Sequence, residues 1–179
     1  MTVLLIIIAV VVIIFLYAIY LGNNLIRKKN KIDEARSGIE VALTKRYDML
    51  TKLLDVAKAY ASHEKELFAQ TIRMRKGMSL EEMEKADTSM SQITQGLRAV
   101  AESYPELHSD TTFKELQAGI RDAEDQLQAA RRVYNSNVTS YNTALQVFPS
   151  NIIANFRKLA KESLYEAEEI KKNDVKMTF

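Results

Sequence analysis

The stretch VLLIIIAVVVIIFLYAIYL, residues 3–21, decides the fold of this 179-residue chain. It contains no charged residue, no amide and no proline. At about 1.5 Å of rise per residue, a helix of this length extends about 30 Å, the thickness of the hydrocarbon core of a bilayer. A helix buried in a soluble core is seldom apolar on every face over such a length. The sequence therefore predicts a transmembrane anchor in residues 1–22, with the lipid bilayer as the partner of residues 3–21.

The two flanks of this stretch indicate whether it is cleaved and which of its ends faces the cytoplasm. Only Met1 and Thr2 precede it, so neither the basic segment nor the small-residue cleavage site of a signal peptide is present, and we expect the anchor to be retained. Lys and Arg gather on the cytoplasmic flank of a membrane span. Basic residues occur here only on the carboxyl side, at Arg27, Lys28, Lys29 and Lys31. The sequence thus predicts a single-pass protein whose remaining residues are cytoplasmic.

The composition excludes several classes of function. There are 25 Lys and Arg against 23 Asp and Glu, a formal net charge of +2, with both signs interspersed along the chain. Such a balance gives no strong field for nucleic acid, and we expect no nucleic-acid partner. The absence of cysteine rules out disulfides and thiolate metal sites. The two prolines, Pro105 and Pro149, stand at the ends of long periodic segments, as in helical proteins.

Apolar residues at helical spacing predict a first long helix over residues 25–74. Gly22, Asn23 and Asn24 are the expected joint between this helix and the anchor. Gly77 is the expected C-terminal cap, with a turn at residues 76–79.

Three further helices follow in the same way. Ser79 and Glu82 have capping-box spacing and open a helix that Pro105 ends, and Thr112 with Glu115 repeats that spacing before a helix that runs to about residue 148. Ser150 is the expected cap of a fourth helix with apolar positions up to residue 170. The predicted fold is all-α: an N-terminal transmembrane helix and an antiparallel helical bundle of about four long helices in residues 23–174, with a short tail at 175–179.

No set of residues points to catalysis. Two-metal helical bundles pair a glutamate with a histidine three residues later, but Tyr60 precedes His63 and Pro105 precedes His108 at that offset. No glycine-rich phosphate loop and no nucleophile elbow occurs. We therefore predict no catalytic, cofactor-binding or metal-binding residues, no cofactor, and no enzyme activity.

Tyrosine and asparagine recur on one face of the third predicted helix. Tyr134, Asn137 and Tyr141 share a core register, and buried amides and phenols need hydrogen-bond partners, so these residues are a candidate packing layer that fixes how helices meet. A ligand or peptide site is the alternative interpretation. Residues 46–48 can supply a complementary polar layer, although the sequence does not pair the two.

Short segments spread along the chain form a specific combination: NKIDEA (30–35), KRYD (45–48), YASHE (60–64), AESYPEL (101–107), FKELQ (113–117), ARRVYN (130–135), YN (141–142) and FPSN (148–151). Together they resemble the LemA family of bacterial membrane-anchored proteins. The resemblance implies a mostly helical domain behind one transmembrane helix in the bacterial cell membrane, and it adds no catalytic residue.

The predicted helix lengths suggest a surface for self-association. A first helix of about 75 Å is followed by a second that returns only about 40 Å, so the membrane-proximal third of the first helix lacks a cover. Apolar side chains left uncovered there favour a homo-oligomeric seam. Contact of this region with lipid headgroups is the alternative. The candidate self-association residues are Ile32, Ala35, Ile39 and Leu43.

These features together predict a membrane-tethered helical scaffold or adaptor without catalytic activity, which self-associates and binds an unknown membrane or cytoplasmic protein. Two other classes of function stay open. One is a bundle enzyme with a carboxylate site hidden among the many acidic residues. The other is a membrane-linked sensor that passes a signal along the first helix.

Overall fold

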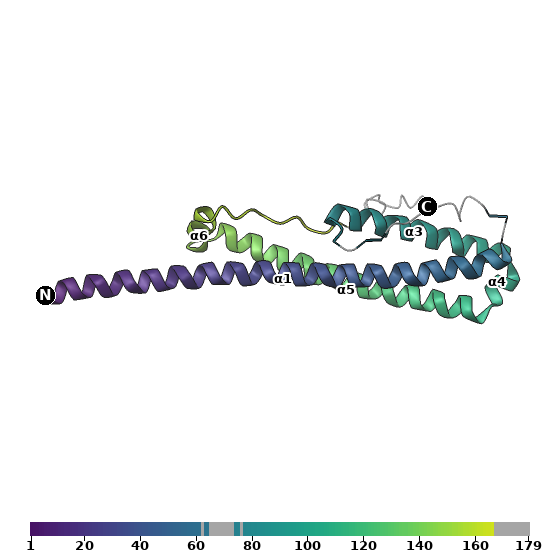
Figure 1. Cartoon of the computed structure of the whole chain (residues 1–179), viewed down its shortest axis with the longest axis horizontal. Coiled ribbons are helices and arrows are strands. Elements are labelled where there is room, and N and C mark those ends of the chain that lie inside the picture. The colour runs from purple at the N-terminus through teal and green to yellow at the C-terminus, as the bar shows by residue number, and fades with distance from the viewer. Residues whose placement is uncertain (62, 65–73, 76, 167–179) are drawn as a thin grey trace, which may run out of the picture. The chain divides into compact units, whose positions relative to one another are not determined.

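The computed structural model describes residues 1–61, 63–64, 74–75 and 77–166, and every regular element in them is a helix (Figure 1). The all-α class, with a long apolar N-terminal helix followed by further helices, is confirmed. Sequence-based expectations for residues 65–73, for the end of the fourth helix beyond residue 166 and for the tail at 175–179 lie outside the described residues. The helices are α1 (Thr2–Tyr60), α3 (Leu80–Ser103), α4 (Pro105–Ser109), α5 (Thr111–Gln146) and α6 (Ser150–Phe156).

The chain forms two compact units. Unit 1 contains residues 1–36 and 132–164, and unit 2 contains the described residues between 37 and 131 together with residues 165 and 166. The helices α1 and α5 therefore contribute residues to both. The extent predicted for a single bundle domain, residues 23–174, stays a prediction.

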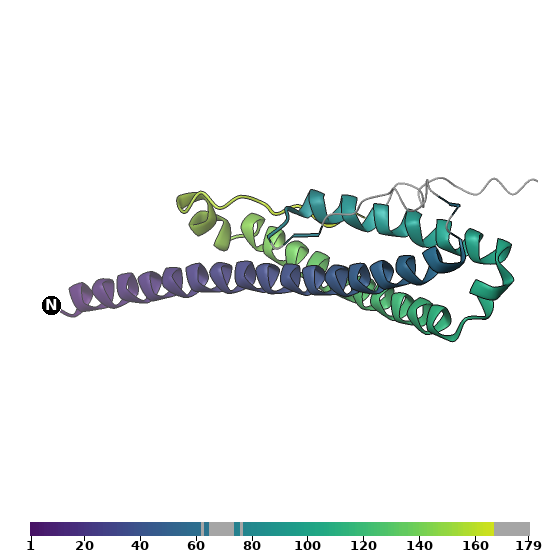
Figure 2. The same cartoon turned by 45° about the vertical axis from the view of Figure 1, so that its right-hand side comes forward.

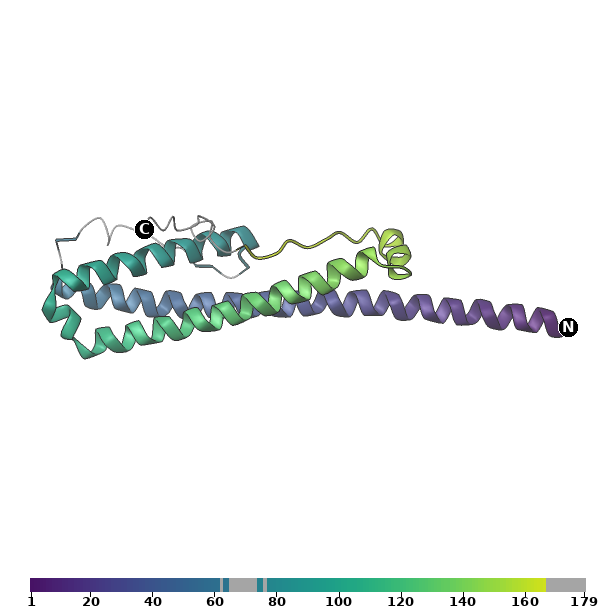
Figure 3. The ribbon, with the colours of Figure 1, turned by 180° about the vertical axis from the view of Figure 1, so that it is seen from behind.

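In unit 1, α1 lies against the last turns of α5, which run in the opposite direction (Figure 3). Two hydrogen bonds fix the register: Lys28 Nζ donates to Ser140 Oγ at 2.6 Å, and Asn137 Nδ2 donates to the Lys31 carbonyl at 3.0 Å. After α6, residues 157–164 pass back along α5 without helical structure. The buried side chains of this unit include Leu25, Ile32, Tyr134, Val138 and Tyr141.

In unit 2, residues 37–60 of α1 pack with α3 and with the first half of α5 (Figure 2). Two hydrogen bonds show that α3 runs parallel to α1: the Gly77 backbone N–H donates to Glu40, and further along both segments Arg46 donates to Asp87. This differs from the expected return of the second helix, since Gly77, just before α3, already lies beside Glu40. The buried core includes Leu50, Leu53, Met90, Ile93, Leu97, Leu107, Phe113 and Ile120.

The helix α1 passes through residues 22–24 without a break, so the predicted joint is wrong. Gly22 instead permits a close approach. The guanidinium of Arg157 lies so near that a Cβ placed on Gly22 would be 3.1 Å from Arg157 Nη2. The glycine therefore makes room for a side chain from the end of α6 and does not act as a hinge.

The first helix also ends earlier than its apolar stripe predicts, at Tyr60 and not near residue 74. No glycine or proline marks this end. Tertiary contacts hold it: the Tyr60 hydroxyl donates to Asp110 Oδ2 at 2.9 Å, and Ala61 is fully buried. Gly77 does adopt a left-handed conformation, with φ of 76°, but in the turn before α3 and not at the end of α1.

One predicted capping box is confirmed and one is wrong. Ser79 Oγ accepts from the Glu82 backbone N–H while the Glu82 carboxylate accepts from the Ser79 N–H, as expected at the start of α3. The cap of α5 is Asp110, whose Oδ1 accepts from the Phe113 N–H at 2.8 Å, and not Thr112. Aspartate is a stronger N-cap than threonine, and Asp110 caps the helix one half-turn earlier, at the Phe113 amide and not at the Glu115 amide.

The fourth helix is much shorter than predicted, because α6 ends at Phe156. Lys158 adopts a left-handed conformation with φ of 54°, and the N–H groups of Leu159 and Lys158 donate to the carbonyls of Ala154 and Asn155. This pair of hydrogen bonds is the Schellman motif, which stops a helix. Ser150 does not cap α6; its hydroxyl donates to the carbonyls of α5 and of the turn that follows, at Ala144 and Val147.

Candidate functional site

Charged side chains occupy core positions on three helices of unit 2, α1, α3 and α5. Arg46 of α1, Asp87 of α3 and Arg131 of α5 have side chains that are only 3%, 8% and 12% exposed. Each stands in the same three-and-four register as its buried apolar neighbours, such as Leu43 and Leu50 on either side of Arg46. The sequence carried this signal, a charge inside an apolar stripe, on each of the three helices.

Asp87 lies at the centre of this network. Its Oδ1 accepts from Arg46 Nη1 at 2.5 Å, and its Oδ2 is ion-paired with Arg131. Arg46 Nη2 also contacts Glu124 Oε1 at 2.8 Å. The Tyr165 hydroxyl reaches Asp87 Oδ2 at 3.4 Å, and the guanidinium of Arg131 lies 4.8 Å from the centre of the Tyr165 ring. Two arginines and two carboxylates thus balance their charges inside the bundle.

This arrangement suits structural specification better than acid–base chemistry. A carboxylate held by two guanidinium groups is stabilised in its ionised form and is a weak proton acceptor. Arginine does not lose its proton in this pH range. Removing one partner of a buried ion pair leaves an uncompensated charge and costs about 3–5 kcal/mol. The network therefore fixes which faces of α1, α3 and α5 meet. Burial also raises the pKa of the Tyr165 phenol, against the opposing charge of Arg131.

A polar cavity of about 490 Å³ adjoins the network between α3 and α5. Its wall brings Arg98, an exposed residue, close to Arg131 and Glu124. Its other polar lining comes from Ser91, Thr94, Gln95 and Gln128. The sequence reasoning missed this cavity, because only the three-dimensional pairing of α3 and α5 creates it.

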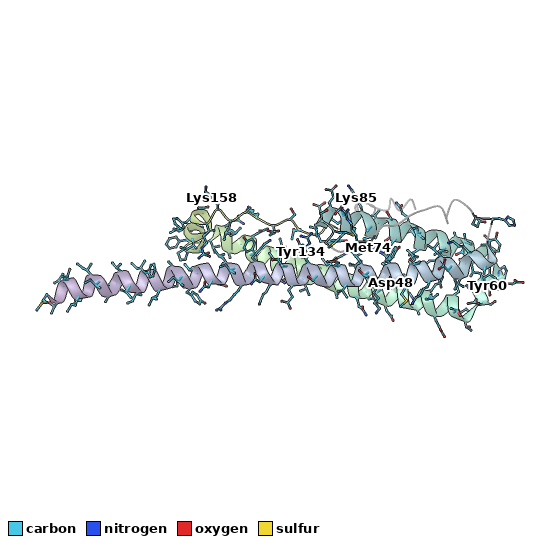
Figure 4. The ribbon with its side chains drawn as sticks, in the orientation of Figure 1. Asp48, Tyr60, Met74, Lys85, Tyr134 and Lys158 are labelled. Carbon is cyan, nitrogen blue, oxygen red and sulfur yellow. The ribbon has the colours of Figure 1, made fainter. Side chains whose placement is uncertain are left out.

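A second, wider hollow of about 810 Å³ lies along residues 37–52 of α1 and is closed on one side by Met74 and Arg75. Figure 4 shows Asp48 and Met74 at this groove. The exposed Val41 and the thioether of Met49 supply apolar lining, and no metal-binding cluster of His, Asp and Glu occurs here or elsewhere among the described residues. His63 and His108 accordingly stay without an assigned chemical role.

The candidate packing layer lies in unit 1, where Figure 4 marks Tyr134. The Tyr134 hydroxyl donates to the Ser163 carbonyl at 3.0 Å, and Asn137 donates to the Lys31 carbonyl. Tyr134 and Tyr141 are buried, whereas Asn137 is half-buried. These side chains meet α1 and residues 157–164, and the Arg46 region belongs to the ion network of unit 2 instead. Their role in fixing helix packing stays a prediction.

Two further polar contacts hold residues 157–164 in place. Asn142 and Glu162 exchange hydrogen bonds, with the Asn142 amide N–H donating to the Glu162 carbonyl at 2.9 Å and the Glu162 backbone N–H donating to Asn142 Oδ1 at 3.0 Å. The Glu162 carboxylate is also ion-paired with Lys29. Burial lowers the pKa of Lys29, but the hydrogen bond and the charge of Glu162 outweigh this effect and raise it overall. Burial raises the pKa of the nearby Tyr141.

The candidate self-association residues are not left uncovered, and this premise of the sequence reasoning is wrong. Ile32 and Ala35 in unit 1, and Ile39 and Leu43 in unit 2, are at most 9% exposed within one chain. The physical reason is that α5 runs antiparallel to α1 in each unit, with Asn137 beside Lys31 and Glu124 beside Arg46. Self-association itself is not tested by a single chain and stays a prediction.

The anchor residues differ from every other part of α1. Large apolar side chains from Val3 to Tyr20 are exposed, and α1 is the one described helix long and apolar enough to cross a membrane. The fold and the exposed span together define a class: an all-helical protein with one N-terminal segment suited to a bilayer. The family model of the LemA family matches residues 35–179, and the chain belongs to this family.

The relatives found by sequence comparison agree with this class. The chain is 28% identical to Protein LemA of Metamycoplasma hominis over 89% of its own length and 76% of that protein. It is 24% identical to Magnetosome protein MamQ of Magnetospirillum gryphiswaldense over 66% of its length, and 23% identical to Magnetosome protein MamQ 2 of Paramagnetospirillum magneticum over 74%. It spans only 55% and 60% of these two magnetosome proteins.

Proposed function

We propose that this protein is a membrane-tethered helical scaffold or adaptor without catalytic activity. One observation carries the proposal: a single helix, α1, has an exposed, wholly apolar end at residues 3–21 and a buried stripe from Leu25 onward. Exposed apolar residues of this extent are stable only in a bilayer or against a partner. The same helix thus serves as the anchor and as part of the core of each unit.

The buried charges support the absence of catalysis. An enzyme of the helical-bundle type needs a carboxylate that is free to bind a metal ion or to move a proton. Asp87 is held by Arg46 and Arg131, and Glu124 accepts from Arg46. The related proteins are named LemA and, in one group, for the magnetosome, and these names refer to no reaction.

We propose that the helical units face the cytoplasm. Arg27, Lys28, Lys29 and Lys31 follow the span closely, which favours this orientation. Because the chain has no cysteine, a single exposed residue such as Asp125 can be replaced by cysteine and treated with a membrane-impermeant maleimide. We expect labelling only after the cells are permeabilised. Equal labelling of intact and permeabilised cells would place the units outside and refute the orientation.

We further propose that the chain self-associates and that a membrane or cytoplasmic protein binds it. Val41, 69% exposed on α1 near the buried seam residues, marks a face that a second chain can contact. Single cysteines at Val41 and at Ile39 provide a matched pair for crosslinking in native membranes. We expect crosslinked dimers from Val41→Cys and none from Ile39→Cys. Dimers from Ile39→Cys instead would support the seam predicted from the sequence, and recovery of a lone monomer from native membranes would count against both associations.

A further inference from the structure

The helix α6 and the turn before it carry an apolar surface that the rest of unit 1 does not cover. We define the α6 patch as Phe148, Ile152 and Phe156, which are 79%, 57% and 86% exposed. Ile152 and Phe156 lie four residues apart on one face of α6, and Phe148 lies in the turn that precedes this helix. The opposite face of α6 is the packed one, because Ser150 and Ala154 are buried. The short helix therefore turns its small residues inward and its large apolar residues outward.

The patch lies where the membrane span ends. Arg157, the residue after Phe156, places its guanidinium against Gly22, and Gly22 directly follows the apolar run of residues 3–21. Figures 1 and 3 both show α6 beside α1 at this point, and Figure 4 marks Lys158 at the end of α6. A bilayer that holds residues 3–21 would thus have its interface at the level of α6.

The charged residues around the patch are also suited to the headgroup region of a bilayer. Arg157, Lys158 and Lys161 are exposed and follow the patch directly in the sequence, and Lys28 lies on the first turns of α1 after Gly22. Glu162, the acidic residue of this segment, is ion-paired with Lys29. Large apolar side chains flanked by basic residues bind the headgroup region of membranes that contain anionic lipids.

We propose that the α6 patch is a second membrane contact, which inserts into the interface of the same leaflet from which α1 emerges. The proposal rests on the anchoring of residues 3–21 and adds a shallow contact to it. Phenylalanine and isoleucine would enter the acyl boundary, and the basic residues would contact lipid phosphates. The bilayer is favoured over a protein occupant because the patch is adjacent to the span in unit 1 and its flank is cationic. This contact would fix the angle of unit 1 at the membrane surface.

Depth-dependent fluorescence quenching of the full chain in vesicles tests this directly. A fluorophore on Asn155→Cys reports on α6 without altering the patch, one on Val12→Cys reports on the span, and one on Asp125→Cys reports on unit 2. Vesicles contain neutral lipid with and without one third phosphatidylglycerol, and quencher lipids carry bromine near the headgroup or deep in the acyl chain. We expect deep quenching at position 12, shallow quenching at 155 that increases with the anionic lipid, and none at 125.

Variants separate the possible outcomes. Replacing Phe148, Ile152 and Phe156 together by serine should abolish shallow quenching at position 155 and leave position 12 unchanged, whereas Val133→Ser, an exposed apolar position on α5, should change neither. Quenching at 12 without quenching at 155 overturns the α6 contact and leaves the anchor intact. Absence of quenching at position 12 in the chain with an unaltered patch refutes the anchor itself. A patch variant that alters oligomer size and not quenching at 155 would make the patch a protein interface and contradict the proposal.

Discussion

The two units hold their helices together with polar clusters of different kinds. Unit 2 uses full charges, with Asp87 between Arg46 and Arg131 in a buried network. Unit 1 uses neutral hydrogen bonds from Tyr134 and from asparagine side chains to backbone carbonyls, and its ion pair between Lys29 and Glu162 lies at a half-exposed edge. A buried charge without its partner costs more than a lost neutral hydrogen bond. The contrast predicts that unit 2 is the more sensitive of the two to a single isosteric change.

The largest effect is expected for Asp87→Asn. The side chain keeps its shape, but Arg131 loses the counter-charge of Asp87 and Arg46 keeps only that of Glu124. The free energy of unfolding should therefore fall by about 3–5 kcal/mol. Urea unfolding of the full chain in detergent measures this change, and Asp122→Asn on the exposed face of α5 is the control.

The triple variant Arg46→Met, Asp87→Leu, Arg131→Met removes the three buried charges together and leaves only Glu124, whose side chain is 33% exposed. It should recover most of the lost stability, because apolar side chains of similar volume often replace a buried ion network at little cost. If the triple variant is less stable than Asp87→Asn alone, the network contributes in some way other than charge pairing.

Smaller losses are expected in unit 1. Tyr134→Ala and Tyr141→Ala should each lower the free energy of unfolding by about 3 kcal/mol, since each removes a buried aromatic ring. Tyr134→Phe keeps the ring and removes only the hydrogen bond to Ser163, and should cost about 1 kcal/mol. Unchanged melting of the alanine variants would argue that these residues form a ligand or peptide site and not a packing layer.

A small gain is expected where α6 ends. Lys158 holds a left-handed conformation that glycine adopts without strain, so Lys158→Gly should raise the free energy of unfolding by about 1 kcal/mol. Lys161→Gly, in the extended segment that follows, is the control. A loss of stability in the first variant would indicate that the Lys158 side chain contributes more than its backbone strain costs.

The smallest effect concerns pH. The hydrogen bond from the Phe113 N–H, followed by that from Tyr60, holds the pKa of Asp110 below its ordinary value. A lowered pKa stabilises the fold above the unfolded pKa, and this contribution is lost as the pH falls below roughly 4. Asp110→Asn keeps a capping side chain that does not titrate. The stability of the native chain relative to this variant should therefore decrease on acidification, and a constant difference from pH 7 to pH 3 would contradict the assignment of the cap.

The class of the fold was predictable because local patterns determine it. Residues 3–21, the capping box at Ser79 and Glu82, and the apolar stripes of α1, α3 and α5 all act within a few turns of helix. The direction of α3 relative to α1 was not predictable in the same way. Nothing in the sequence shows that Gly77, just before α3, lies beside Glu40, and α3 is therefore parallel to α1 and not antiparallel as predicted.

The same difference between local patterns and contacts of distant segments explains which polar clusters were predicted. Tyr134 and Tyr141 stand out in the sequence and are buried, whereas Asp87 and Arg131 form a network only when three distant segments meet. A charge in an apolar register was visible at each position, but its partner was not. The end of α6 was not predicted because the left-handed residue that stops this helix is a lysine, Lys158, and not the usual glycine.

Extraction of native membranes at alkaline pH tests the central claim, that residues 3–21 anchor the chain. The full chain should stay in the membrane pellet. The variant Ile8→Lys, Ile13→Lys, which adds two charges to the span at a cost of about 2.5–3.5 kcal/mol each near the membrane centre, should move to the supernatant while the helical content of the two units persists. Release of the unaltered chain, or retention of the doubly charged variant, would contradict the account.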